Sequence, residues 1–503
     1  MKKLLLVLCS LVALNGCGGG GGDTPAPTPP VNPPVVTPPQ TVYGPDGCTP
    51  ANATTMMAQG VEAIKPLRPN KQVVSKLIVK YKDEAQAPNS VAAAMARWSS
   101  SNANSNIRPT AITQQGRHGV DLGDGVSVQD AETFARELEK DPNVVYASPD
   151  YIMKSQVLEP NFTSMEWQLS DPLYGVKALD AWTLSKGDGV TVAVIDTGYL
   201  DDRNSTNDNT VNGDVTPNLL LPGYSFISRP EVANAGGFTR GPNALDTGDW
   251  VTKEEVTTTG SPFYGCEQQN SMWHGFNIMS LIASVDDGVN MVGIAPHSKV
   301  LPVRVTGKCG ASNSDLIDGM RWAAGLPVAG APLNTQPAKV LNLSLGNYSQ
   351  CSSAMQAAVN DVIAAGVTVV VAAGNDNQPV SSFSPANCKG VISVGATTNR
   401  GLRAWFSNTG ADIMAPGQAV AFRSNQGATT ATTFWNRTGD GTSYAAPLVV
   451  GTAALMLSVN PKLTPAQVKD ILVSTSAPKS TCNANFGGQM NSYAAVLKAM
   501  NTH

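Results

Sequence analysis

The hydrophobic positions of this chain change their pattern near residue 160. Beyond that point, short apolar runs without polar alternation recur at residues 190–196, 300–305, 339–345, 367–373 and 390–396. Uninterrupted runs of this length are typical of parallel strands that are buried on both faces. Helical patterns lie between them at 314–325 and 353–366, and Gly366 is a suitable C-cap for the second. The alternation predicts a doubly wound, mostly parallel α/β domain over residues 160–503.

A smaller unit is expected before that domain, over residues 71–155. Strand patterns occupy 75–81, 119–123 and 143–151, and helical patterns occupy 91–98 and 128–140. Ser127 is placed to act as the N-cap of the second helix. The order strand–helix–strand–helix–strand predicts a small α+β unit of ferredoxin-like type.

The first 17 residues have the features of an export signal. Two lysines precede an apolar run of about eleven residues, which is too short to span a bilayer as a mature helix. The segment ends in Leu14-Asn15-Gly16-Cys17, which resembles a bacterial lipobox whose cysteine is lipidated. An ordinary secretory signal with a chance cysteine is the alternative. Residues 18–70 begin with a Gly- and Pro-rich stretch and form a tether that can hold a domain away from a membrane.

Composition narrows the classes of function. Charged residues make up 14% of the 503 residues, well below the roughly 25% of an average soluble domain, and this suits a secreted, loop-rich protein. The net charge of -4 argues against a nucleic-acid partner, because such a protein needs a basic face.

The cysteine pattern predicts disulfides. Two of the eight cysteines belong to the signal, and six remain: Cys48, Cys266, Cys309, Cys351, Cys388 and Cys482. In an exported chain, six cysteines predict disulfide bonds, with about fifteen possible connectivities. The chain has no Cys-x-x-Cys pair, so a structural zinc site is not expected.

Polar residues with catalytic potential stand at element boundaries of the α/β domain. Asp196 ends the run 190–196, Asn375 follows the run 367–373, and Ser443 opens an apolar helix. Catalytic groups of a doubly wound sheet collect at the carboxyl ends of its strands. A helix N-terminus also supplies free N–H groups and positive potential, here beside Ser443.

A serine nucleophile needs a base, and the base needs an orienting carboxylate. Three of the four histidines lie in the small unit, in a connecting turn and at the chain end: His118, His297 and His503. Only His274 remains, at the head of an apolar helix in the α/β domain. Taken alone, it is a histidine packed under a loop. Taken with Asp196, Asn375 and Ser443, it completes a catalytic triad beside an amide donor.

The motifs around these residues resemble those of subtilisin-like serine proteases, the subtilases. The matching motifs are Val-Ala-Val-Ile-Asp-Thr-Gly, Trp-His-Gly and Gly-Thr-Ser-Tyr-Ala-Ala-Pro, in the chain order Asp, His, Ser. The resemblance implies a subtilisin-like fold and a serine endopeptidase that acts on proteins or peptides without a catalytic cofactor. The unit at 71–155 resembles the subtilase propeptide, an intramolecular chaperone and inhibitor. Self-cleavage is then expected between residues 151 and 166.

The resemblance also implies a role for each residue. Asp196 orients His274 and stabilises its protonated form. His274 takes the proton of Ser443, which attacks the peptide carbonyl, and returns it to the leaving amine. The Asn375 side chain and the Ser443 N–H stabilise the oxyanion, and one such donor is worth roughly 3–4 kcal/mol.

Further sites follow from the same resemblance. Ser344, Leu345 and Gly346 are the strand that pairs with an extended substrate. The loop 285–291 matches the family's calcium loop in length, with Asp287 as its side-chain ligand; a solvated acidic turn is the alternative. The implied disulfides are Cys266–Cys309 and Cys351–Cys388, while Cys482 stays free or pairs with Cys48. The cysteine pattern is similar to that of secreted proteases of Gram-negative bacteria, which implies export to the outer membrane or cell surface, or release.

Two other functions compete with this interpretation. Asp-Thr-Gly also marks aspartic proteases, and the chain has two such motifs, at Asp196 and Asp246. They are too close for one per β-lobe, and Asp246 follows no apolar strand. The second alternative is a surface-tethered pseudoprotease that only binds, because Phe276, Asn277 and Ser280 stand where the family usually has threonine, histidine and glycine.

Overall fold

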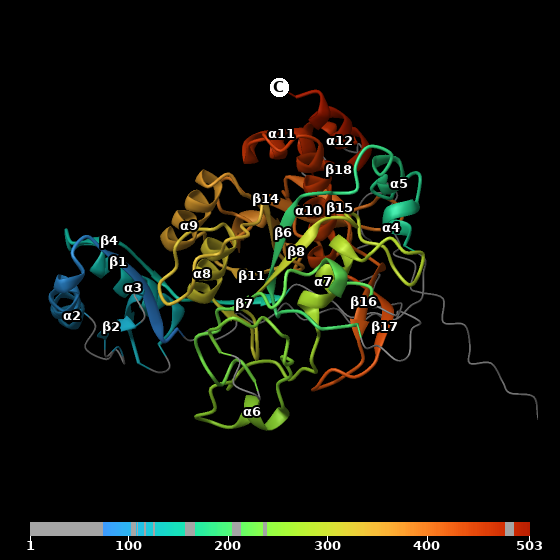
Figure 1. Ribbon diagram of the computed structural model, residues 1–503. Coiled ribbons are helices and arrows are strands. Elements are labelled where there is room, and N and C mark those ends of the chain that lie inside the picture. The colour runs from blue at the N-terminus through green and yellow to red at the C-terminus, as the bar shows by residue number, and fades with distance from the viewer. Residues whose placement is uncertain are drawn as a thin grey trace, which may run out of the picture.

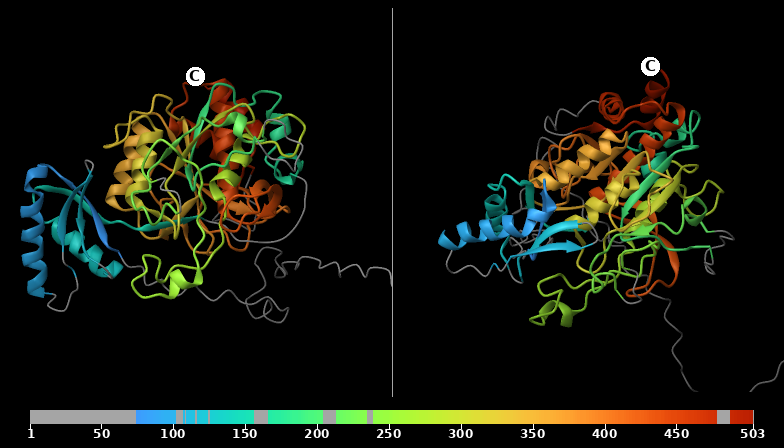
Figure 2. Two further views of the ribbon diagram at one scale, coloured as in Figure 1. Left: turned by 60° about the horizontal axis from the view of Figure 1, so that its bottom comes forward. Right: turned by 60° about the vertical axis from the view of Figure 1, so that its left-hand side comes forward.

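The computed structural model describes residues 74–155, 166–203, 213–234, 239–477 and 487–502, except 102–106, 108, 115–116 and 124–125. The export signal, the tether, Cys48, Cys482 and most of the expected cleavage segment lie outside these residues. Figure 1 shows a small unit in blue and teal beside a larger α/β unit. The small unit lies at one side of the larger one in the further views as well (Figure 2).

The small unit is the predicted ferredoxin-like α+β fold. Its elements are β1 (Lys76–Tyr81), α2 (Ala87–Ser101), β2 (Thr110–Gln114), β3 (Arg117–Asp121), α3 (Val128–Leu138) and β4 (Val144–Pro149). They form an antiparallel sheet in the order β2-β3-β1-β4. The Ser127 side chain accepts a hydrogen bond from Asp130 N and so caps α3 as expected. The sequence pattern missed β2, an edge strand that pairs only with β3.

The predicted doubly wound α/β domain is confirmed. Its eight strands run in the order β18-β15-β14-β12-β10-β6-β8-β7, and every pairing between them is parallel. In chain order the strands are β6 (Thr191–Asp196), β7 (Tyr224–Ser225), β8 (Lys299–Arg304), β10 (Val340–Leu343), β12 (Thr368–Ala372), β14 (Ile392–Thr397), β15 (Ile413–Pro416) and β18 (Gly488–Gln489). All positions of β10 and β12 are buried, as their uninterrupted apolar runs predict.

Helices cover both faces of this sheet. One face carries α7 (His274–Ala283), α10 (Thr442–Val459), α11 (Pro465–Thr475) and α12 (Ser492–Met500), and the other carries α8 (Asn313–Ala323) and α9 (Ser353–Ala364). Among the described helices, only α10 is long and apolar enough to cross a membrane, but 89% of it is buried inside the protein. It is therefore the central core helix, and its buried N-terminus brings Ser443 into the interior.

Smaller elements complete the larger unit. A second sheet has the order β13-β11-β5-β9 and joins the small unit to the large one. Its strands are β5 (Ile152–Ser155), β9 (Ala311–Ser312), β11 (Leu345–Tyr348) and β13 (Phe383–Ser384). The remaining elements are α4 (Trp167–Ser170), α5 (Ala178–Ala181), α6 (Lys253–Thr257) and the hairpin of β16 (Val420–Asn425) with β17 (Phe434–Gly439).

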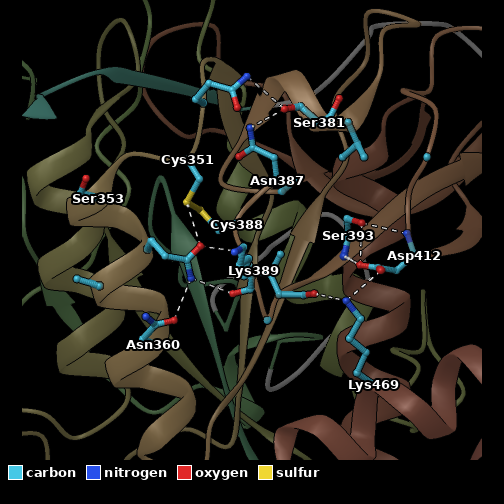
Figure 3. A pocket seen from close by; sticks show the side chains of 18 residues that line it. Cys351, Ser353, Asn360, Ser381, Asn387, Cys388, Lys389, Ser393, Asp412 and Lys469 are labelled. Atoms are coloured by element: carbon cyan, nitrogen blue, oxygen red, sulfur yellow. Dashed lines mark hydrogen bonds and ion pairs between the residues drawn. A yellow bond between two sulfur atoms is a disulfide. The ribbon is translucent and has the colours of Figure 1, made fainter. Parts of the chain in front are cut away.

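Two disulfides stabilise the larger unit, Cys266–Cys309 and Cys351–Cys388. These are the two pairs that the resemblance implies. Cys351–Cys388 lies in a surface groove between α9 and the loops around residues 380–391 (Figure 3). In that groove Asp412 accepts hydrogen bonds from Ser393 N and Oγ, both at 2.9 Å, and forms an ion pair with Lys469. The groove contains none of the expected catalytic residues.

Replacing Cys351 and Cys388 together by serine is expected to lower the free energy of unfolding. The bond closes a loop with a sequence separation of 37, which corresponds to about 4 kcal/mol in the chain-entropy model. Urea unfolding of wild type and variant measures the difference, and the Cys266→Ser/Cys309→Ser pair is expected to lose a similar amount. Peptide mapping that links Cys309 to Cys351 would contradict this connectivity.

Candidate active site

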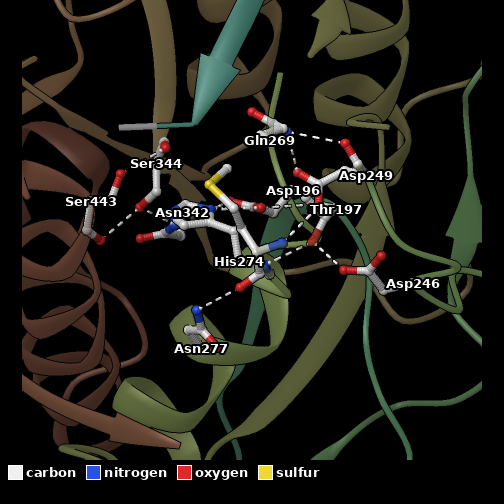
Figure 4. Close-up of polar contacts among 12 residues, drawn as sticks. Asp196, Thr197, Asp246, Asp249, Gln269, His274, Asn277, Asn342, Ser344 and Ser443 are labelled. Carbon is white, nitrogen blue, oxygen red and sulfur yellow. Dashed lines mark hydrogen bonds and ion pairs between the residues drawn. The ribbon is translucent and has the colours of Figure 1, made fainter. Parts of the chain in front are cut away.

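Three expected site residues meet because neighbouring strands end at one edge of the sheet. Asp196 is the last residue of β6, Ser344 follows β10, and Asn375 lies three residues beyond β12. These strands are adjacent, with Asn342 opposite Val194 on β6 and Val370 on β12. The N-termini of α7 and α10 supply His274 and Ser443 to the same place (Figure 4).

His274 and Asp196 form a fully buried pair. Nδ1 of His274 lies 2.8 Å and 2.9 Å from the two carboxylate oxygens of Asp196, and neither side chain is exposed. Nε2 of His274 has no hydrogen-bond partner. The pairing fixes the ring orientation and leaves Nε2 available as a proton acceptor.

Ser443 is joined by two reciprocal hydrogen bonds to Ser344, the residue between β10 and β11. Ser443 Oγ donates to the Ser344 carbonyl at 2.9 Å, and Ser344 Oγ donates to the Ser443 carbonyl at 2.9 Å. The second bond is possible because Pro447, four residues along α10, has no N–H to donate to that carbonyl. A proline inside the helix therefore leaves the Ser443 carbonyl free to accept the hydrogen bond that joins Ser344 to α10.

Asn375 presents an unused amide donor at this site. Its Oδ1 accepts hydrogen bonds from Thr442 N at 2.9 Å and from Thr442 Oγ1 at 2.8 Å. Its buried Nδ2 has no hydrogen-bond partner. Since Thr442 holds the oxygen end of the amide, the nitrogen end is preorganised to donate to an anionic oxygen near Ser443.

An extended segment of the chain lies along the edge of β11. Strand β5 pairs antiparallel with β11, with Ser155 opposite Leu345 and Lys154 opposite Gly346. On its other side β5 pairs with β9. A Cβ atom on Gly346 would lie 2.5 Å from the Phe383 ring, so only glycine fits beneath this strand. The edge of β11 that is expected to bind substrate is thus paired with β5 of the same chain.

The segment before β5 is fixed to the start of α8. The Asp150 carboxylate accepts hydrogen bonds from Ser314 N at 2.9 Å and from Ser314 Oγ at 2.8 Å. The Tyr151 carbonyl accepts one from Asn313 N at 2.7 Å. A carboxylate at a helix N-terminus is favourable, so this contact holds the small unit in register with the larger one.

The three unusual residues after His274 have partners on the β16–β17 hairpin, within α7 or in the residues just before α7. The Phe276 ring packs against Phe434, with 5.3 Å between ring centroids. Asn277 Nδ2 donates to the Met272 carbonyl at 3.1 Å. Ser280 Oγ donates to the Asn277 carbonyl at 2.7 Å and accepts from Arg423 N at 3.1 Å. Each substitution is thus accommodated without displacing the buried histidine–aspartate pair.

The loop 285–291 is the calcium site that the resemblance implies. Asp287 is exposed, and its Oδ1 accepts a hydrogen bond from Val289 N within its own turn at 2.9 Å. The described part of the chain contains no cluster of three His, Cys, Asp or Glu side chains suited to a metal. Asp287 is therefore not part of such a cluster, and further ligands around the loop have to be main-chain or single side-chain oxygens.

Two carboxyl groups that the sequence did not point out border this loop. Asp214 is fully buried, neither of its carboxyl oxygens has a hydrogen-bond partner, and its carbonyl accepts from Val285 N at 2.8 Å. Burial raises the pKa of Asp214 to about 8. Glu166 accepts from Val292 N at 3.1 Å, and burial raises its pKa to about 7. Ca²⁺ binds carboxylate and carbonyl oxygens, so the unpaired Asp214 carboxyl and the carbonyl groups of the loop have the chemistry of a calcium site.

Comparisons with known proteins give consistent matches. The sequence profile of the Subtilase family (Peptidase S8) matches residues 187–491. An extracellular protease of Xanthomonas campestris is 41% identical over 380 residues, covering 74% of this chain and 62% of the relative. An extracellular basic protease of Dichelobacter nodosus is 37% identical over 361 residues, covering 70% and 57%. The chain thus spans less than two thirds of the length of these curated relatives.

Solved structures show the same fold. A protease from Pseudoalteromonas arctica superposes with a TM-score of 0.61 at 38% identity, covering 66% of this chain and 97% of that one. Fervidolysin from Fervidobacterium pennivorans has a TM-score of 0.58 at 22% identity and covers 86% of this chain and 62% of its own. The predicted α/β architecture preceded by a small α+β unit is thereby confirmed.

Proposed function

This chain belongs to the subtilase family, and on that premise we propose that it is an exported serine endopeptidase whose triad is Asp196, His274 and Ser443. The observation that carries the proposal is the buried Asp196–His274 pair, whose free Nε2 lies at the strand edge where Ser443 and the Asn375 amide also converge. The relatives described as extracellular proteases support export and proteolysis.

In the proposed reaction, Ser443 Oγ turns from the Ser344 carbonyl toward His274 Nε2. The hydroxyl proton passes to Nε2 as Oγ attacks the carbonyl carbon of the scissile peptide bond. Asn375 Nδ2 and the Ser443 N–H stabilise the oxyanion, while the Asp196 carboxylate stabilises the imidazolium. His274 then gives the proton to the leaving amine, and water releases the acyl group by the same steps. No cofactor takes part.

Fluorophosphonate labelling of the processed protein tests this proposal. We expect wild type to be labelled at Ser443 and the His274→Ala variant to lose labelling, because the hydroxyl then has no base. His297→Ala is a matched control, since His297 forms an exposed pair with Asp188 at 3.0 Å outside the site. Absence of labelling in folded, processed wild type would refute the endopeptidase and favour a pseudoprotease that only binds.

We further propose that the unit at 71–155 is a propeptide that inhibits the enzyme at 160–503. Two observations support this. Strand β5 occupies the edge of β11 as an extended substrate would, and Asp150 and Tyr151 fix the preceding residues to α8. An extended segment held this way blocks the site, so cleavage after it is required for release.

The export signal adds an attachment point. We propose that Cys17 is lipidated and that the tether at 18–70 holds the precursor at the outer membrane or cell surface of a Gram-negative bacterium. Because the lipid is then on the propeptide side of the cleavage segment, self-processing releases the catalytic domain from the membrane.

Replacing Ser443 by alanine is expected to leave full-length precursor. Wild type should be cut between residues 151 and 166, because this segment includes β5, which pairs with β11 next to Ser344. N-terminal sequencing and electrophoresis measure both outcomes. Ser458→Ala, at the half-buried C-terminal end of the same helix, should be processed normally. Normal trimming of the Ser443→Ala protein would mean that another protease cuts it.

We also propose a structural calcium ion at the loop 285–291. Asp287 is the ligand expected from the sequence, and Asp214 is a second carboxyl group, whose buried oxygens have no hydrogen-bond partner and whose charge a cation would compensate. Carbonyl groups of the loop would supply further oxygens. When bound, the ion would compensate the buried negative charge of Asp214 and hold the loop beside the end of α7.

The calcium proposal predicts a pH-dependent stability. Without calcium, the folded-state pKa of Asp214, about 8, exceeds its unfolded value of about 3.9. The native state then binds more protons, and the free energy of unfolding falls as pH rises between these values. Calcium should remove this loss by favouring the carboxylate.

The measurement is urea unfolding of the uncut Ser443→Ala protein near pH 5 and pH 8, in EDTA and in calcium. Adding Asp214→Asn should abolish most of the calcium-dependent difference, whereas adding Asp287→Asn should reduce it less. Equal stability with and without calcium at the higher pH would exclude the ion.

A further inference from the structure

The second Asp-Thr-Gly motif, at residues 246–248, has no role in the proposed reaction but lies directly beside the first. Thr197 Oγ1 donates a hydrogen bond to Asp246 Oδ2 at 2.5 Å. The main chain is tied at the same point, since Asp246 N donates to the Tyr199 carbonyl at 2.8 Å. Figure 4 shows Asp246 and Asp249 on the far side of Thr197 and Asp196 from Ser443. The motif therefore contacts the residues that follow Asp196, on the side away from Ser443.

Asp246 acts on the start of α7 through Thr197. The Thr197 hydroxyl, which donates to Asp246, also accepts a hydrogen bond from Gly275 N at 2.9 Å. Gly275 directly follows His274, and its N–H is one of the helix-terminal donors that have no partner within the helix. The acidic partner fixes the direction of the hydroxyl, so its lone pair faces the helix.

Asp249 acts on the residue two positions before His274. Its Oδ1 accepts a hydrogen bond from Met272 N at 2.8 Å, and its Oδ2 accepts one from Gln269 Nε2 at 3.1 Å. Only 1% of Asp249 is exposed. The carboxylate thus joins the loop that contains Asp249 to the residues that lead into α7.

The turn between these two contacts is conformationally unfavourable. Trp273 has a φ of 54°, in the left-handed region, and its side chain makes no capping bond to α7. A bulky residue rarely adopts this conformation unless its surroundings impose it. The N–H groups of Met272 and Gly275 flank Trp273 and His274, and both are held by this pair of aspartates, one directly and one through Thr197.

Burying these two carboxyls is costly, which argues that they serve the site. Burial raises the pKa of Asp246 to about 6, against the lowering effect of the buried Arg304. Burial, followed by the charge of Asp246, raises the pKa of Asp249 to about 7. An apolar pair of similar size would avoid this desolvation but would leave the Met272 N–H and the Thr197 hydroxyl proton without acceptors.

We propose that Asp246 and Asp249 are positioning residues that hold the left-handed entry to α7, and thereby hold the His274 ring between Asp196 and Ser443. This inference rests on the proposed endopeptidase function. It assigns to the second Asp-Thr-Gly motif a supporting role in a serine mechanism.

The test compares Asp249→Ala with Asp249→Asn in processed protein. Asparagine keeps an oxygen that accepts from Met272 N, whereas alanine removes it. We expect kcat of Asp249→Ala to fall about 10- to 100-fold, since a displacement of about 1 Å has that effect, with KM changed less than about twofold. Asp249→Asn should recover kcat to within about threefold. The substrate is an internally quenched peptide with the sequence of residues 150–167.

A second pair of variants, at Thr197, tests the contact with Asp246 independently. It also provides a result if Asp249→Ala fails to fold. Thr197→Val removes the hydroxyl at nearly constant volume and should lower kcat similarly, while Thr197→Ser should retain it. Asp412→Ala is the matched control, because Asp412 also accepts from a backbone N–H, on Ser393, but lies in the groove of Figure 3. Its kcat should equal that of wild type.

The outcomes separate the two proposals. Wild type that fails to react with fluorophosphonate refutes the endopeptidase itself. Active wild type with unchanged kcat in both Asp249→Ala and Thr197→Val overturns the positioning role. The positioning role is also overturned if kcat is lost in Asp249→Asn and Thr197→Ser as well. The same holds if kcat of Asp412→Ala falls as much as that of Asp249→Ala. Losses confined to the alanine and valine variants at constant KM support it.

Discussion

Parallel strands that are neighbours in a sheet end at the same edge, and the whole site depends on this constraint. Asp196, Ser344 and Asn375 are far apart in the sequence but follow β6, β10 and β12, which are adjacent. The helices α7 and α10 then need only begin at that edge to add His274 and Ser443. Strand order thus brings most of these side chains together, and hydrogen bonds set their final orientations.

The hydrogen bonds around the site hold several ionisable side chains in the protein interior, away from water. The Asp196–His274 pair, Asp246, Asp249 and Arg304 are all nearly inaccessible to water. Electrostatic interactions are stronger in such surroundings, and fixed groups need no reorganisation during reaction. The buried carboxyls cost stability, and the broad apolar core around α10 offsets that cost. The site can therefore contain buried carboxyls only because the apolar core around α10 is large.

Much of this was predictable from the sequence, and the exceptions share a physical cause. Uninterrupted apolar runs predicted five of the eight strands of the sheet, namely β6, β8, β10, β12 and β14, and the element boundaries pointed to Asp196, His274 and Ser443. The edge strand β2 and the pairing of β5 with β11 were not predictable, because they depend on partners distant in the chain. The positions of Asp214 and Asp249 were also hidden, since burial and hydrogen bonding distinguish them from ordinary surface acids only in the folded protein.

The position of β5 between β11 and β9 has a consequence for what can enter the site. Strands in a sheet lie about 4.8 Å apart, and β5 meets each edge with a single extended backbone, Ile152 and Met153 at β9 and Lys154 and Ser155 at β11. A helix, about 10–12 Å across with its side chains, cannot replace a strand there, and neither can a hairpin. Under the proposed endopeptidase function, a substrate that takes this place has to be extended, so its conformation is selected before its sequence.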